Sequence, residues 1–431
     1  MNFVKQLWFL FKVFLIFSSE YLFLLFHTDK LRFIDKLTKR LANVNILYVK
    51  IFQAIALNNN LIDENINNTL MKFTDNAPWT RDDIDVDTLN ALKEEQQLVL
   101  SDGVYNPINS GMISLVFKAT RNSDDSNVII KIKRRMIERK LKDAIDNLLF
   151  FMYVLSFIPL ISKYQISEVV NKNIDMIKHQ VNFNEEVENL LKIKNNCKNL
   201  KYVKIPDVFK DVTDKYPNVI LMEQINGVPI NKIQEEDYIG FAKQVLKFGF
   251  VTSLIHGVTH GDLHGGNILF IKDDNDTKYK YKIGVIDFGI IFELDTEFKS
   301  ALFDVLTEMF NISSELTAKK ILYSGLIEPH DLIKTMPIEH QNNIIKIISE
   351  ALYNNSKHAN QVNIYKFLSE FKTYISNPEI ANLGIRPSDN LVKTQMVLAM
   401  AHGVTLTLCK DDYMTFANNV INELFHTNMI M

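Results

Sequence analysis

The stretch that decides the fold reads HGDLHGGNILF at residues 260–270 and continues, after a turn rich in Asp and Asn, with GVIDFG at residues 284–289. The apolar runs on the two sides of the turn have the composition of β-strands, so the stretch predicts a loop, a hairpin and a second loop. The hairpin would bring the loop with Asp262 and Asn267 beside the loop with Asp287. Three side chains that carry oxygen atoms are therefore expected to converge.

This arrangement suits phosphoryl transfer, which needs Mg²⁺ on the phosphates and a carboxylate near the attacking hydroxyl or water. We expect Asp287 and Asn267 to bind the metal and Asp262 to position the nucleophile or act as base. His-x-Asp, an Asn five residues after the Asp, and Asp-Phe-Gly after a hairpin follow one another in the order found in protein kinases. The sequence thus predicts a kinase-like site for ATP.

A zinc site is the alternative for the same stretch, because His260 and His264 have the spacing of two ligands on a helix. The stretch lacks the Glu of a zinc-protease helix, and the two glycines directly after His264 argue against a helix. The zinc site is therefore the less favoured interpretation, behind a structural role for either histidine.

Kinase chemistry also needs a lysine and a glutamate upstream of these loops. Lys131 lies between isoleucines at residues 129–132, as does the strand lysine that contacts the α- and β-phosphates. Alone it would read as an ordinary edge-strand charge. Glu186 can pair with Lys131 from a helix, although the acidic run around it also suits a solvated face. Periodicity does not choose between Glu185 and Glu186.

The remaining nucleotide contacts are expected from a hinge and from a phosphate-covering loop. Residues 221–227 read as a strand that ends in a hinge, where the backbone of Glu223 and Ile225 would meet adenine. The loop before the lysine strand offers Ser110 and Gly111 to the phosphates. It has one glycine where protein kinases have three, and fewer glycines allow fewer close approaches of backbone to phosphate. The loop therefore indicates an atypical kinase.

These residues together resemble the UbiB family of atypical kinases, which is linked to ubiquinone biosynthesis and lipid metabolism. The resemblance covers residues from about 45 to 300. Lys50 and Gln53 match the ends of the family's Lys-x-Gly-Gln motif, with Phe52 in place of Gly. The loop keeps the family's Pro107-Ile108 start but loses its alanines.

The family's Glu-x-Asp motif is also altered, because Gln180 and Asn182 replace both acidic residues. The residues that follow match the family, and this match selects Glu186 over Glu185. The resemblance implies that Lys50 and Gln53 belong to a regulatory extension that folds over the active site and disfavours protein substrates. The activities that the resemblance then allows are ATP hydrolysis and phosphorylation of a small-molecule or lipid-linked acceptor, in support of quinone or lipid metabolism. Their cofactors would be ATP and Mg²⁺.

We expect an α+β, bilobal protein kinase-like fold with ATP and Mg²⁺ between its lobes. Four segments are predicted: an apolar membrane-associating segment at 1–30, a helical extension at 31–100, an N-lobe with a helical insertion at 101–225, and a helical C-lobe with the catalytic and metal-binding loops at 226–431. Within the N-lobe, residues 113–119 and 128–133 are expected to form a hairpin.

Within residues 1–27, residues 7–17 are apolar except for Lys12, and a polar group that ends at Glu20 separates them from a second apolar run at 21–26. Lys5, Lys12 and Ser19 would form one narrow polar stripe, which suits a helix at a membrane interface. A single span, a buried helix and a signal sequence are the alternatives. We expect a membrane-associated, intracellular protein, and we leave a homodimer open.

Composition limits the other classes of function. Hydrophobic residues make up 47% and charged residues 23%, which argues against a disordered or multi-span membrane protein. The formal charge of −3 gives no basic field to attract nucleic acid, so no nucleic-acid partner is expected. Two cysteines cannot build a disulfide framework.

Two rival functions stay open beside the kinase. A nucleotide-binding scaffold without catalysis, or pseudokinase, would suit the altered loop, Phe52 and the two amides. An enzyme like aminoglycoside or choline kinases would share the His-x-Asp loop and the metal aspartate. That enzyme would not explain residues 50–53 or the Pro107-Ile108 start of the loop.

Overall fold

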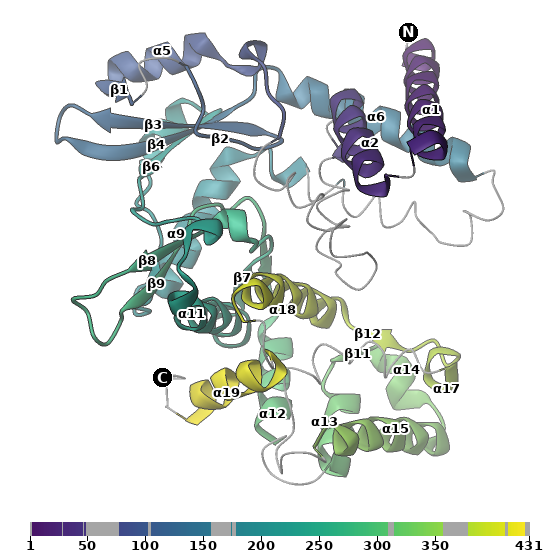
Figure 1. The fold of residues 1–431 in the computed structure, drawn as a ribbon. Helices are drawn as coiled ribbons and strands as arrows, with labels where there is room; N and C mark the ends of the chain where they lie inside the picture. Colours follow the sequence, from purple (N-terminus) through teal and green to yellow (C-terminus); the bar gives the residue numbers. More distant parts are fainter. Residues whose placement is uncertain are drawn as a thin grey trace. The chain divides into compact units, whose positions relative to one another are not determined.

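The computed structural model describes residues 2–27, 29–45, 47–48, 77–101, 105–156, 174, 178–308, 314–356, 378–409 and 413–426. The chain forms two compact units, which Figure 1 shows as a ribbon. Unit 1 consists of Met1–Asn189 and Pro206–Gln224, and unit 2 consists of Leu190–Ile205 and Ile225–Met431.

Unit 1 combines an antiparallel sheet with helices. Its elements are α1 (Asn2–His27), α2 (Lys30–Val44), η1 (Arg81–Asp83), α5 (Val86–Glu95), β1 (Leu98–Leu100), β2 (Asn109–Ser110), β3 (Ser114–Arg121), β4 (Ser126–Lys133), α6 (Ile137–Ser156), the first part of α9 (Phe183–Cys197), α10 (Lys210–Lys215) and β6 (Val219–Glu223). The strands follow the order β1-β3-β4-β6, and β2 pairs with β3.

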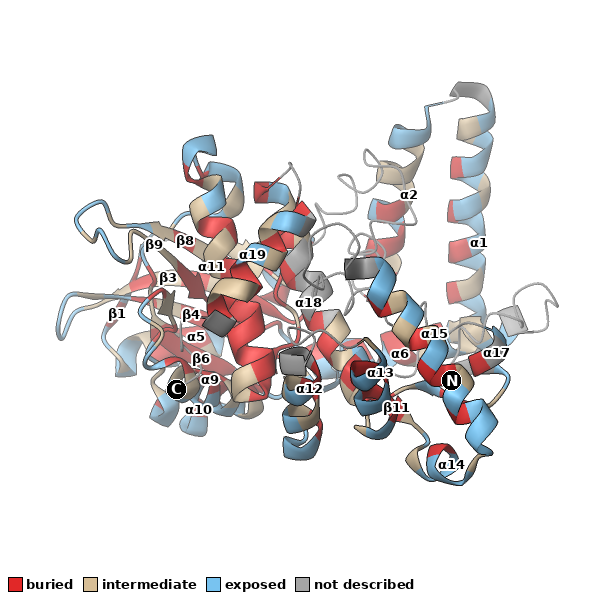
Figure 2. Cartoon of the chain, turned by 90° about the horizontal axis from the view of Figure 1, so that it is seen from below, coloured by how far each residue is buried: buried red, intermediate tan, exposed pale blue. Residues whose placement is uncertain are grey.

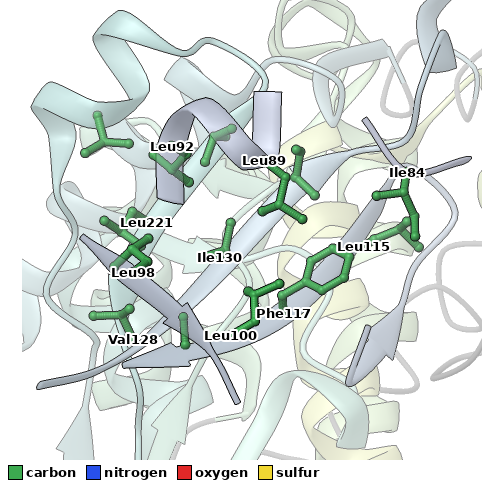
Figure 3. Packing of buried hydrophobic residues seen from close by; sticks show 14 residues of the cluster. Ile84, Leu89, Leu92, Leu98, Leu100, Leu115, Phe117, Val128, Ile130 and Leu221 are labelled. Carbon is green, nitrogen blue, oxygen red and sulfur yellow. The ribbon is translucent and has the colours of Figure 1, made fainter. Parts of the chain in front are cut away.

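The alternation of side chains along β4 decides what each face of this sheet carries. Val128, Ile130 and Ile132 point to one face, where they join the core that packs beneath α5 (Figure 3). Because successive side chains of a strand point to opposite faces, Lys131 and Lys133 lie on the other face. That face is covered by a second core, built largely from α6 and α9.

Unit 2 is mostly helical, and the strands among its described residues form three small sheets. Its elements are the end of α9, β5 (Val203–Lys204), η2 (Ile230–Lys232), η3 (Glu235–Asp237), α11 (Tyr238–Phe250), the π-helical turn η4 (Val251–His256), β7 (Val258–His260), η5 (Gly265–Asn267), β8 (Ile268–Lys272), β9 (Tyr281–Val285), β10 (Ile291–Glu293), α12 (Thr296–Glu308), α13 (Ser314–Tyr323), β11 (Ile327–Glu328), α14 (His330–Thr335), α15 (Ile338–Ser356), α17 (Pro378–Ala381), β12 (Arg386–Pro387), α18 (Asp389–Leu408) and α19 (Tyr413–His426). β8 and β9 form a hairpin, and β5 lies parallel to β9. β7 pairs with β10.

Both hairpins predicted from the sequence are present, as β3–β4 and β8–β9. The helical prediction for residues 31–100 is wrong at β1, which pairs with β3. Only three residues of β1 alternate between buried and exposed, so its pattern is too short to stand out. The same reason applies to β11 and β12 in the region predicted to be almost wholly helical. The four-segment division stays a prediction.

Candidate active site

Lys131 and Glu186 form a buried ion pair within unit 1. The Lys131 Nζ lies 2.5 Å from the Glu186 Oε1, and the two side chains are 9% and 5% exposed. β4 supplies the lysine and α9 supplies the glutamate. The ammonium groups of Lys131 and Lys133 also lie over the ring of Phe183, 5.7 and 5.4 Å from its centroid. The first residue of α9 thus helps to hold both lysines.

Asn182, one of the two amides that depart from the UbiB motif, caps the helix that carries Glu186. Its Oδ1 accepts the backbone N–H of Glu185 at 3.4 Å, and its carbonyl accepts the N–H of Glu186 at 3.1 Å. Asn and Asp both serve as N-caps, so this replacement keeps the cap. The Oε1 of Gln180 is buried without a hydrogen-bond partner among the residues that the structure describes.

His260 joins the two loops that carry the predicted catalytic residues of unit 2. It ends β7 and is fully buried. Its Nδ1 accepts the backbone N–H of Asp262 at 3.0 Å, and its Nε2 contacts the carbonyl of Asp287. Because Nδ1 accepts, Nε2 must carry the proton and donate to Asp287. Burial lowers the pKa of His260 despite the nearby charge of Asp287, which favours this neutral form.

The two predicted metal ligands, Asn267 and Asp287, are oriented by backbone contacts. The Asn267 amide nitrogen donates to the carbonyl of Asp262 at 2.9 Å, which turns the amide oxygen away from that carbonyl. One carboxylate oxygen of Asp287 accepts the N–H of Gly289 at 3.0 Å. Carboxylate and amide oxygens are ligands that Mg²⁺ accepts. The donor set of these loops therefore fits a magnesium ion.

The zinc alternative for the two histidines is wrong. His260 ends a strand and His264 caps the short helix η5, so they do not lie on one helix. Both ring nitrogens of His260 are engaged by backbone, and the Nδ1 of His264 accepts the N–H of Gly266 at 3.1 Å. A zinc ligand must keep a ring lone pair for the metal. Nε2 of His264 lies 3.9 Å from the Asp262 Oδ2.

The family model described as "ABC1 atypical kinase-like domain" matches residues 74–321. The chain belongs to this family. The match spans both hairpins and every predicted site residue except Lys50 and Gln53. It confirms the resemblance to UbiB proteins and the α+β, bilobal kinase-like fold that the motifs predicted.

Curated relatives of this ABC1 chain carry the name "Probable protein kinase UbiB". The protein from Shewanella sp. strain MR-7 is 24% identical over 330 residues, which are 74% of this chain and 58% of the relative. The protein from Blochmanniella pennsylvanica is 28% identical over 229 residues, which are 51% of this chain and 41% of the relative. The match therefore covers 58% and 41% of the length of these two curated relatives.

Two solved structures align with much of the ABC1 chain at low identity. The Rv3197–erythromycin complex from Mycobacterium tuberculosis aligns with 83% of this chain and 87% of that chain, at 17% identity and a TM-score of 0.49. The Rio2 kinase–ADP/Mg²⁺–phosphoaspartate complex from Chaetomium thermophilum aligns with 78% and 74%, at 12% identity and a TM-score of 0.28. The family assignment rests on the sequence match.

The ABC1 chain passes from unit 1 to unit 2 at the predicted hinge, between Gln224 and Ile225. The Glu223 side chain accepts the N–H of Asp207 at 3.1 Å, and the Glu223 N–H donates to the Asp207 carbonyl at 2.7 Å. Ile225 is 6% exposed and packs closely on Gly284. A Cβ atom added at Gly284 would lie only 2.8 Å from the Cγ2 of Ile225. The hinge is therefore anchored on both sides, and its contact with adenine stays a prediction.

The Ser110 hydroxyl, predicted to face the phosphates, is already engaged within unit 1. It is buried, donates to the Ala77 carbonyl at 2.7 Å, and accepts from the guanidinium of Arg134 at 2.7 Å. Arg134 also donates to the carbonyl of Gly111 at 3.0 Å. The turn of Ser110 and Gly111 is thus held by contacts within unit 1, and a contact of Ser110 with phosphate stays a prediction.

Arg134 and Asp83 tie this turn to residues 77–83, which lie within the predicted helical extension. The Arg134 guanidinium donates to the Pro78 carbonyl at 2.8 Å and to the Asp83 carboxylate at 3.2 Å. Burial alone would raise the pKa of Asp83, but the hydrogen bond from Lys140, with Thr80 and Arg134, holds it below its ordinary value. This stabilisation is present at neutral pH and is lost as the pH falls through the lowered pKa.

Replacing Arg134 by Met should destabilise unit 1 strongly. The change leaves Asp83 with one basic partner and deprives buried carbonyls and the Ser110 hydroxyl of their donor, which typically costs about 3–5 kcal/mol. Thermal unfolding should show the loss as a lower midpoint. Arg139, an exposed neighbour on α6, gives the matched control, and Arg139→Met should leave the midpoint nearly unchanged. Equal midpoints for the two variants would contradict the network.

The structure collects the predicted residues in two sets, with Lys131 and Glu186 in unit 1 and Asp262, Asn267 and Asp287 in unit 2. Lys50 and Gln53 lie outside the described residues. Sequence reasoning missed the network of Arg134 and the link made by His260. The run of basic residues at 133–135 reads as a solvated face and gave no signal for Arg134. The position of His260 at the start of the His-x-Asp motif could have suggested that its ring links the loops of Asp262 and Asp287.

Proposed function

We propose that the chain is an atypical kinase or ATPase of the UbiB type. It binds Mg-ATP and either hydrolyses it or phosphorylates a small-molecule or lipid-linked acceptor. The observation that carries the proposal is the pair of loops joined by His260, which holds the backbone of Asp262 and of Asp287 at once. Phosphoryl transfer depends mainly on positioning and electrostatic stabilisation, and such loops supply both.

Each site residue has a role in this proposal. Asp287 and Asn267 bind the metal, and a bound Mg²⁺ offsets the negative charge of the phosphates. Asp262 orients the attacking hydroxyl or water. Lys131 contacts the α- and β-phosphates, and Glu186 holds Lys131 in position.

Weaker assignments complete the site. The backbone of Glu223 and Ile225 would meet adenine, and the turn of Ser110 and Gly111 would cover the phosphates. Lys50 and Gln53 would belong to a regulatory extension. The protein would work at an intracellular membrane, in support of quinone or lipid metabolism.

ATP turnover by the full chain tests the proposal. We expect Mg²⁺-dependent release of ADP that EDTA abolishes. Asp262→Asn keeps the size of the side chain and removes the base, so turnover should fall by about 10²-fold or more. Asp274→Asn makes the same change on the hairpin turn, where the carboxylate is 70% exposed, and should leave turnover unchanged. Equal turnover for wild type and Asp262→Asn would overturn the role of Asp262.

A nucleotide-binding scaffold without catalysis is the second candidate. It is favoured by the Ser110 hydroxyl, which the protein itself engages, and by the amides Gln180 and Asn182 in place of acidic residues. This function predicts Mg-ATP binding by a folded chain with no turnover above that of Asp262→Asn. Turnover and binding measured on one preparation separate the two candidates.

A further inference from the structure

One side of α1 is a seam packed within unit 1. Phe9, Val13 and Ile16 are buried there, with Glu20 one turn further on. Their spacing of four, three and four residues puts them on one side of the helix. The seam joins a core with residues of α2, and Figure 2 shows the buried side of α1 turned toward α2. α1 is therefore part of the folded unit.

The opposite side of α1 exposes large apolar side chains along the whole helix. The helix has the length and composition to cross a membrane over Val4–Leu25, yet most of that window is not buried. The exposed side chains include Val4, Leu7, Trp8, Phe11, Phe14, Leu15, Tyr21, Leu22 and Leu25, which are 46–73% exposed. A contiguous apolar surface of this kind on a folded protein marks an interaction site.

The contacts of α1 with α2 are incompatible with a simple membrane span. Glu20 is 6% exposed, and one of its carboxylate oxygens lies 2.5 Å from the Arg40 guanidinium of α2. α2 begins three residues after α1 ends and carries six charged residues in 15 positions. A crossing α1 would either draw these charges into hydrocarbon or break the seam, and both are costly. The hairpin fits a membrane surface better.

The charge of the hairpin indicates which surface it fits. Residues 2–44 contain seven basic and three acidic residues, a net charge of +4, whereas the whole chain carries −3. Lys5 and Lys12 form a basic edge along α1, beside the apolar side. Lys30, Arg32 and Lys39 are exposed on α2. An apolar helix face with basic residues beside it is the pattern of interfacial helices that bind anionic lipids.

We propose that the hairpin of α1 and α2 docks on an anionic lipid bilayer surface, with α1 lying along the interface and its exposed apolar side inserted. The seam faces away from the lipid, so α2 stays in water above α1. Electrostatic attraction acts over about one Debye length, roughly 8–10 Å, so the basic residues of α2 still contribute. This docking is independent of nucleotide and does not rest on the proposed catalytic function.

Vesicle flotation of the full chain without nucleotide tests the binding. Vesicles of phosphatidylcholine and phosphatidylserine in equal parts should bind at least about tenfold more protein than pure phosphatidylcholine, and salt should weaken the binding. Phe11→Ser/Phe14→Ser and Lys5→Gln/Lys30→Gln/Lys39→Gln should each weaken it by about tenfold or more. Ile338→Ser/Tyr353→Ser, on equally exposed apolar residues of unit 2, should not. Equal binding to the two kinds of vesicle would overturn the proposal.

Depth-dependent quenching tests the orientation of α1, because Trp8 and Trp79 are the two tryptophans of the chain. Trp8→Phe/Phe14→Trp/Trp79→Phe leaves one tryptophan at the middle of the apolar window. Lipids brominated near the headgroup should quench its fluorescence more than lipids brominated near the chain ends. Stronger quenching by the deep bromines would indicate a span and overturn the proposal. The proposal would also be overturned if the protein formed a stable dimer in solution that did not bind vesicles, because a second copy of the chain would then cover the apolar side of α1.

Discussion

Asp287→Asn is expected to remove the Mg²⁺-dependent part of the stabilisation of the protein by ATP while leaving the unliganded protein nearly as stable as wild type. The change removes the charge that we propose to bind the metal but keeps an oxygen that can accept the Gly289 N–H. A ligand present at about 100 times its Kd stabilises the native state by about 2.7 kcal/mol. For units of this size the unfolding midpoint should rise by about 5 °C or more in wild type. Thermal unfolding of the full chain measures both proteins.

The comparison needs nucleotide without metal and a matched charge change. ATP with EDTA should raise the unfolding midpoints of wild type and Asp287→Asn by similar amounts, because both proteins share the contacts that do not involve the metal. These increases should be smaller than the one that Mg-ATP gives in wild type. Asp274→Asn, on the exposed turn between β8 and β9, should keep the full Mg²⁺-dependent shift. A full shift in Asp287→Asn would mean that this carboxylate does not bind the metal.

Breaking the buried pair of Lys131 and Glu186 should destabilise the protein strongly. Glu186→Gln removes the carboxylate 2.5 Å from a lysine that is 9% exposed, and removal of one partner from a buried pair typically costs about 3–5 kcal/mol. Lys131→Met should cost a similar amount. Lys131→Met/Glu186→Leu removes both charges, and such apolar replacements of a buried pair are often neutral or stabilising. Urea unfolding of wild type, Lys131→Met, Glu186→Leu and the double variant gives the coupling energy.

Activity distinguishes a structural pair from a functional one. The double variant should recover most of the stability but none of the ATP turnover, because the lysine that we propose to contact phosphate is gone. Lys215→Met removes one partner of an exposed pair with Glu95 and should change neither property measurably. Turnover restored in the double variant would show that Lys131 acts only through the fold.

The order of motifs was enough to predict the fold, because each motif has one place in a kinase-like chain. The alternation of residues 128–132 also fixed the face on which Lys131 lies, since a strand has a period of two residues. Local pattern could not place Ser110. Its two-residue strand carries no period, and its partners Ala77 and Arg134 lie 33 and 24 residues away in the sequence.

The link made by His260 depends on tertiary structure in the same way. Its two ring nitrogens contact backbone groups at residues 262 and 287, and the protonated nitrogen is decided by those contacts. The choice of Glu186 over Glu185 needed the family resemblance. The structure supports that choice, because Glu186 reaches Lys131 whereas Glu185 contacts His179 at 3.1 Å.

Calorimetric titration of the full chain with ATP tests the central claim most directly. The account predicts one nucleotide bound per chain in the presence of Mg²⁺, and affinity weaker by about tenfold or more, about 1.4 kcal/mol, in EDTA. No binding of any nucleotide by a chain that unfolds cooperatively would contradict the account. Equal affinity with and without Mg²⁺ would contradict the metal site of Asn267 and Asp287.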